Sequence, residues 1–65
     1  MGGVINLYNV TITTIWESVN IFNYVNGISF DSNFIELHTK SDNYKIAINK
    51  IKDIEIMECG HYEKN

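Results

Sequence analysis

One cysteine and two histidines are the side chains of this sequence best suited to metal binding or nucleophilic catalysis. Cys59 and His61 are separated by one residue, and His38 lies far upstream. A zinc site usually shows paired ligands at regular spacings, which this set does not have. A catalytic thiolate needs an electropositive setting, whereas Glu58 and Glu63 flank Cys59. We therefore expect neither a metal site nor a catalytic cysteine, and no cofactor.

The carboxylates of the chain do not suggest an acid–base pair. Nothing in their spacing fixes two of them at a catalytic distance, and they suit turns and solvated strand faces. The sequence also has no glycine-rich phosphate loop and no serine nucleophile elbow. We expect that the protein is not an enzyme and that these carboxylates have structural roles: Asp31, Glu36, Asp42 and Asp53.

Lysines beside aromatic residues offer a surface for anions. Lysine holds backbone phosphates while aromatic rings stack on unpaired bases. If the loop near residue 40 and the turn near residue 50 lie at one rim, a ring of subunits would repeat this patch. It would suit RNA, or a small anionic nucleotide held at subunit junctions. The expected contact residues are Lys40, Tyr44, Lys45, Lys50 and Lys52, with Phe34 nearby.

The overall charge disfavours nucleic-acid binding without excluding it. The 65 residues carry a formal charge of −3, with five lysines and no arginine. Neutralisation of phosphates supplies much of the affinity of nucleic-acid binders, and arginine is the preferred reader of bases. A protein partner is therefore the first expectation, and RNA or a nucleotide the alternative.

The aromatic residues predict self-association. A single domain of this length buries little surface on its own, and one cysteine cannot form a disulfide within the chain. Apolar residues make up 45% of the sequence, more than one small core needs. We expect a homo-oligomer. Its interface, or the surface for a protein partner, should include Trp16, Phe22, Tyr24 and Phe34.

The segment VNIFNYVNG (19–27) decides the fold class. Its β-branched and aromatic residues favour a strand that ends in a two-residue Asn26-Gly27 hairpin turn. The alternative is a helix over 14–26, since Thr14 and Glu17 match a capping box and Gly27 would suit the helix end.

The remaining pattern is one of short strands. Residues 4–15 form a strand whose phase slips around Tyr8-Asn9, and 28–39 form a long strand with a bulge or kink at 31–33. A hairpin loop follows at 40–43, and two more strands precede Met57. A helix over 48–58 is the alternative there, because isoleucines recur every three residues. We expect a flexible N-terminus at 1–3, one domain at 4–58, and a frayed tail at 59–65.

The predicted fold is therefore all-β: about five short antiparallel strands in a small SH3-like barrel or a curved sheet, with an α+β fold if either helix forms. Two stretches, VNIFNYVNG and FDSNFIELHT followed by YKIAINKIKDIEI, resemble Sm-like proteins, the family of the RNA chaperone Hfq. The resemblance covers roughly Val19 to Ile56. It implies small-barrel architecture, although the basic Tyr-Lys-His signature of the Hfq type is absent.

These expectations combine into a non-enzymatic, oligomeric binding protein. The single cysteine and the lack of an apolar run of about 20 residues fit the reducing cytoplasm and no membrane span. Isoleucine and asparagine are frequent, and arginine, glutamine and proline are missing, a bias common in chains carried by phages or plasmids. We expect an inhibitor or sequestering protein of a mobile element, for example in anti-defence.

Overall fold

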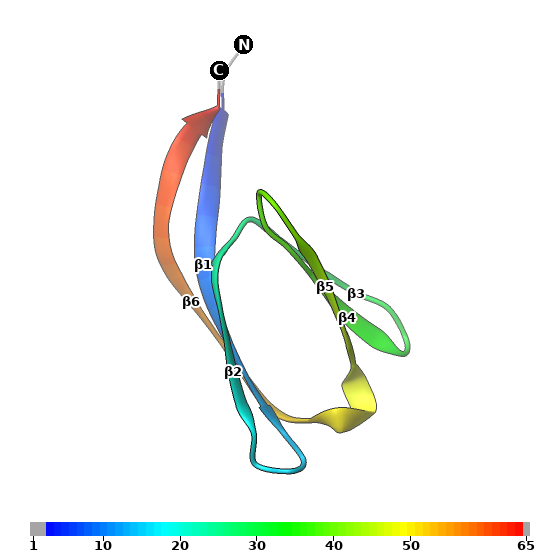
Figure 1. Ribbon diagram of the computed structural model, residues 1–65. Helices are drawn as coiled ribbons and strands as arrows, with labels where there is room; N and C mark the ends of the chain where they lie inside the picture. The colour runs from blue at the N-terminus through cyan, green and yellow to red at the C-terminus, as the bar shows by residue number, and fades with distance from the viewer. Residues whose placement is uncertain (1–2, 65) are drawn as a thin grey trace.

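The computed structural model describes residues 3–64, and nearly all of this part of the chain is β-strand (Figure 1). In chain order the elements are β1 (Gly3–Thr14), β2 (Val19–Val25), β3 (Gly27–Phe30), β4 (Phe34–His38), β5 (Asn43–Ala47), the 3₁₀ turn η1 (Ile48–Lys50) and β6 (Ile51–Lys64). The predicted all-β class is confirmed, with six strands where about five were expected. The expectations for residues 1, 2 and 65 lie outside the described residues.

The strands form two antiparallel, three-stranded sheets. β1 is central in the first sheet, with the order β2-β1-β6, and β4 is central in the second, with the order β3-β4-β5. The sheets do not close into the expected barrel, and the strands are divided between two sheets where the alternative expectation was a single curved sheet. β1 and β6 pair from Gly3–Lys64 to Thr14–Ile51, and their ends project as a two-stranded ribbon (Figure 1).

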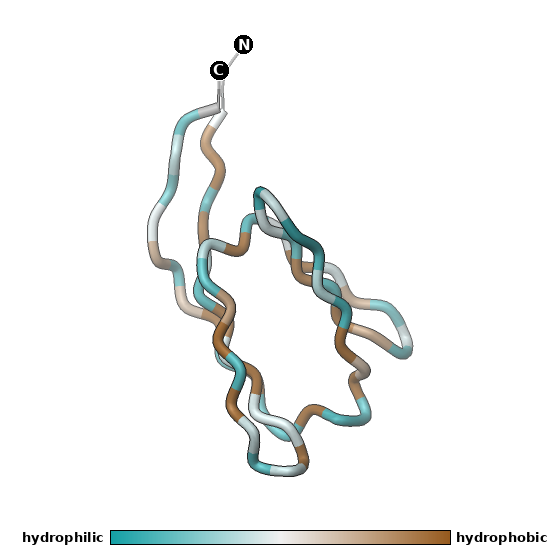
Figure 2. Tube along the Cα trace, viewed as in Figure 1, coloured by the Kyte–Doolittle hydropathy of each residue, from teal (hydrophilic) through white to brown (hydrophobic). Residues whose placement is uncertain are grey.

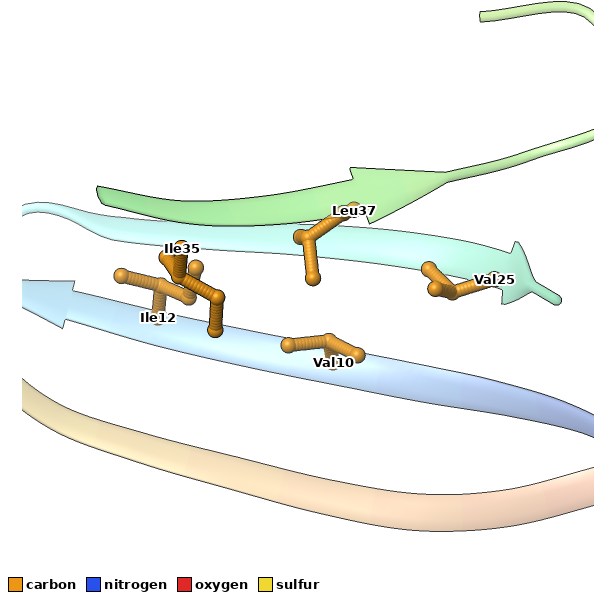
Figure 3. Packing of buried hydrophobic residues seen from close by; sticks show 5 residues of the cluster. All are labelled: Val10, Ile12, Val25, Ile35 and Leu37. Atoms are coloured by element: carbon orange, nitrogen blue, oxygen red, sulfur yellow. The ribbon is translucent and has the colours of Figure 1, made fainter. Parts of the chain in front are cut away.

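Five side chains between the sheets form the core, and each is at most 1% exposed. Val10 and Ile12 come from β1, Val25 from β2, and Ile35 and Leu37 from β4 (Figure 3). Alternate residues of a strand point to opposite faces, so the buried positions in β1 and in β4 are two residues apart. Figure 2 shows hydrophobic and hydrophilic residues alternating along much of the trace. Burial of this small set holds the two sheets together.

Residues 19–25 form a strand, as predicted, but Asn26-Gly27 is not a hairpin turn. β2 pairs with β1, whereas β3 pairs with β4 in the other sheet. The backbone N–H of Asn26 donates a hydrogen bond to the His38 carbonyl (2.8 Å), so the pair marks a corner where the chain changes sheets. The turn motif specifies only local geometry, and both flanking strands pair elsewhere. The alternative helix over 14–26 is also wrong.

The capping-box residues serve a hairpin loop between β1 and β2. The Thr14 hydroxyl accepts hydrogen bonds from the backbone N–H groups of Trp16 (3.3 Å) and Ser18 (3.2 Å). The chain reverses at Glu17, whose φ is 64°. A threonine hydroxyl can satisfy the backbone of a turn as readily as that of a helix start, which explains the misleading signal.

Residues 28–39, expected to be one kinked strand, form the hairpin β3–β4. The Asp31 carboxylate accepts hydrogen bonds from the backbone N–H groups of Asn33 (2.7 Å) and Phe34 (2.8 Å), an arrangement that mimics a backbone turn. These two hydrogen bonds, with a smaller contribution from the Lys45 charge, lower the pKa of Asp31 because they favour the charged carboxylate. The residues read as a kink therefore close a turn.

The C-terminal segment corrects two more expectations. The helix over 48–58 is reduced to the single turn η1, and residues 59–64, expected to be a frayed tail, continue β6 beside β1. Gly3, placed in a flexible N-terminus, pairs with Lys64. The polar composition of residues 59–64 suggested an unstructured tail. In a two-stranded ribbon, however, the backbone is paired while the polar side chains remain in water.

Leu37→Ala should lower the free energy of unfolding by about 2–5 kcal/mol, the usual cost of deleting a fully buried leucine. The matched control is Ile15→Ala, which truncates an exposed side chain in the β1–β2 loop and should cost about 0.5 kcal/mol or less. Urea unfolding at one fixed protein concentration measures both. Equal losses in the two variants would contradict a core confined to these five residues.

Candidate functional site

An open groove separates β2 from the loop between β4 and β5. One wall consists of residues 21–24 of β2, and the other of residues 39–42 of the loop with Tyr44 of β5. The rings of Phe22 and Tyr44 lie 4.9 Å apart with an interplanar angle of 53°, so an aromatic pair links the two sheets here. The groove has a volume of about 460 Å³, within the range of ligand sites.

Tyr24 lies at a β-bulge on the edge of the groove. Between the paired positions Tyr8–Val25 and Val10–Phe22, β1 has one residue and β2 has two. Tyr24 has a φ of 57°, in the left-handed region that bulky residues rarely adopt. The extra residue lets both Phe22 and Val25 pack on the core, while Tyr24 remains 66% exposed. The phase slip predicted around Tyr8-Asn9 of β1 lies opposite this bulge, whose extra residue belongs to β2.

Tyr24 and Lys40 also border a second hollow of about 240 Å³. Its other lining residues are Leu7, Asn26 and Tyr62, of which Leu7 and Tyr62 belong to the β1–β6 ribbon. Sequence reasoning missed Tyr62, which it placed in the tail. The two hollows therefore share an exposed tyrosine and one lysine.

Of the four predicted interface residues, the structure brings two together. Phe22 and Tyr24 line the groove. Trp16 is exposed in the β1–β2 loop, and Phe34 begins β4, at the opposite end of that strand from the 39–42 loop. Exposed aromatic surface is thus spread over three parts of the molecule. Ile21 and Thr39, not singled out from the sequence, complete the groove, and only knowledge of strand pairing could have placed them there.

The predicted lysine patch is divided between the two ends of β5. Lys40 lies before this strand and lines the groove, whereas Lys50 and Lys52 follow the strand. Five residues of strand span about 17 Å, so the single rim that was expected does not form. Lys52, in β6, also forms an ion pair with Glu17 of the β1–β2 loop.

Two lysines lie over aromatic rings. The Nζ of Lys45 is 4.7 Å from the centre of the Phe34 ring, and the Nζ of Lys50 is 5.9 Å from the Trp16 ring. Both distances are within the range of cation–π attraction. Tyr44, predicted to accompany these lysines, contacts Phe22 in the groove instead.

A polar cluster surrounds His38 on the second sheet. Its Nε2 lies 3.0 Å from Glu36 Oε1 and 3.3 Å from Ser29 Oγ, and its Nδ1 lies 2.8 Å from Asn43 Oδ1. A serine beside a histidine nitrogen can form a nucleophile–base pair. Here the Glu36 carboxylate competes for the same nitrogen, so we assign the cluster to side-chain pairing across β3, β4 and β5.

Within residues 3–64, no three side chains of His, Cys, Asp or Glu come together as a metal-binding group. Cys59 is exposed. Over the same range, no helix has the length and apolar character required to cross a membrane.

No protein-family model, curated protein or solved structure matches this chain. The function is therefore inferred from the groove, the charges and the exposed apolar surface.

The bulge conformation predicts an unusual order of stability among variants of Tyr24. Tyr24→Gly should unfold with a free energy about 1 kcal/mol higher than Tyr24→Ala, because only glycine adopts the left-handed region without steric cost. Chemical denaturation of the two variants measures the difference. At Ile21, which has no positive φ, the same pair of substitutions should rank alanine above glycine, and an identical ranking at both positions would contradict the bulge.

Proposed function

We propose that this chain is a non-catalytic binding protein that works as a homo-oligomer. The observation that carries the proposal is the ratio of buried to exposed apolar side chains among the described residues: five are fully buried, while thirteen large ones are exposed. A domain of this size gains little net stability from its own core. Exposed apolar side chains that lie close together, as Val19, Ile21 and Tyr24 do along β2, are typical of surfaces that bind other chains.

The groove is the proposed surface for a protein partner. Tyr24, Phe22 and Tyr44 supply aromatic area of the kind that anchors protein interfaces. Lys40 and Asp42 place one positive and one negative charge at the loop wall. This pair suits a polypeptide segment that carries charges of both signs. A nucleotide with several negative charges would meet only one lysine beside a carboxylate. An inhibitor or sequestering protein of a phage or plasmid is the specific role that we propose.

Static light scattering coupled to gel filtration tests the oligomer. The molar mass should be at least twice the 7.5 kDa of one chain, and the melting temperature should rise with protein concentration by mass action. A mass of one chain over the whole range from low to high micromolar concentration would refute self-association.

An RNA-binding role is the second candidate, and the lysines that lie over Trp16 and Phe34 favour it. Single-strand binders combine aromatic stacking surfaces with nearby cations, and Lys50 beside the exposed Trp16 has this composition. The resemblance to Sm-like proteins agrees with this candidate, and the net charge of −3 opposes it.

Titration of a single-stranded oligoribonucleotide at several salt concentrations distinguishes the candidates. If RNA is the ligand, Lys50→Ala should reduce the slope of log affinity against log salt by about 0.7, the value of one phosphate contact on a single strand. Lys40→Ala, at the other end of β5, is the matched control and should leave that slope unchanged. Absence of binding at low salt would eliminate the RNA role.

A further inference from the structure

We propose that the free edge of β2 pairs with the β2 edge of a second copy of this chain, in antiparallel orientation. The β2-β1-β6 sheet of each copy contributes three strands, and the two would join into one sheet with the strand order β6-β1-β2-β2-β1-β6. The inference rests on the proposed self-association and names the surface and the partner. It also fixes the assembly as a closed dimer.

The outer edge of β2 is available for pairing. Within residues 3–64, the only strand paired with β2 is β1, and the backbone hydrogen bonds between other elements do not include residues 19–25. An edge strand presents a row of unpaired N–H and C=O groups that can bind another strand. Val19 and Ile21 lie on the outer face, opposite Thr13 and Thr11, and are 60% and 63% exposed.

The distribution of charge selects a second copy as the occupant. In a two-fold pairing, residues near the axis meet their own copies, so a charge there faces an identical charge. All seven residues of β2 are uncharged. Such a strand can meet itself without repulsion, a condition that a different partner would not require.

The other free edges are protected against the same pairing. β6 carries four carboxylates, at Asp53, Glu55, Glu58 and Glu63, against two lysines at positions 52 and 64, so two copies of this edge would meet with a net negative charge on each. Lys45 lies in the short edge strand β5, and β3 has only four residues. Charged and short edges are common devices against unwanted pairing. With β6 at both ends of the joined sheet, growth stops at two copies.

The side chains of β2 also define a register. Directly opposed residues of an antiparallel pair lie on the same face, and the bulge at Tyr24 ends the regular stretch. Centring the axis on Asn20 places Val19 of each copy opposite Ile21 of the other, so four apolar side chains meet on the outer face. Centring the axis on Ile21 would instead place Val19 opposite Asn23. We therefore assign the axis to Asn20.

This register also turns the Trp16 loop of each copy toward the side of the other copy on which the groove lies. The ladder ends at Val19, where β2 begins, and beyond it the loop that carries Trp16 lies on the side of the partner's Tyr24 bulge. The dimer would thus bring together aromatic surface that a single chain leaves dispersed.

Disulfide trapping tests the axis, in a Cys59→Ser background that removes the native thiol. The distance of about 4.5–5.5 Å between opposed Cα atoms suits a disulfide. Under oxidised glutathione, Asn20→Cys should form a covalent dimer at least ~10-fold faster than Glu55→Cys on β6, because pairing raises the effective thiol concentration. Equal rates, or faster cross-linking of Ile21→Cys than of Asn20→Cys, would overturn the assigned axis.

Ile21→Lys tests the pairing without a cross-link. It places two lysines at diagonal positions across the axis, with their backbones about 7–8 Å apart, and should raise the dimer dissociation constant at least ~100-fold. Val4→Lys, an equally exposed position on β1 away from β2, should leave it unchanged, and circular dichroism should show the same fold in both. If the parent chain is oligomeric and Ile21→Lys is equally so, this inference fails alone; if the parent chain is monomeric, the proposed function fails as well.

Discussion

Contact between the two sheets depends on five fully buried side chains, two of them from the central strand β1. Val10 and Ile12 reach the second sheet at Ile35 and Leu37 of β4 (Figure 3). Partly buried hydrophobic residues of both sheets surround this contact, among them Phe22 and Ile46, and an open groove lies between β2 and the 39–42 loop. The Phe22–Tyr44 contact lies at one point of this groove. A small core therefore leaves both the groove and much of the apolar side-chain surface exposed.

Alternation along the chain was sufficient to predict strands but not their partners. The pattern at 19–25 indicates a strand because β-branched and aromatic residues alternate there. The Asn26-Gly27 signal was misleading because a turn motif carries no information about where its flanking strands find hydrogen-bond partners. The second sheet pairs consecutive strands, but the first sheet also joins β1 to β6 at the other end of the chain, with Gly3 paired to Lys64 as the extreme case. Such pairing depends on burial in the whole molecule, which a local pattern does not contain.

The candidate site was predictable only in part, for the same reason. Aromatic residues were expected to lie at an interface, and Phe22 and Tyr24 do share a groove. The lysines were grouped by their closeness in sequence, although Lys40 precedes β5 and Lys50 follows it, so that the strand separates them. A phase slip at Tyr8-Asn9 was visible in the sequence. The extra residue lies in β2, where it turns Tyr24 outward, and it could be located only once β1 and β2 were paired.

The pairing of Gly3 with Lys64 brings both ends of the described chain to the tip of one ribbon (Figure 1). Two connections can therefore leave the domain side by side, at the end of the ribbon away from the β1–β2 loop. A domain with this geometry can be inserted into a surface loop of a host protein with little separation of the loop's ends. The β1–β6 ribbon would then act as a stalk that carries both sheets clear of the host surface.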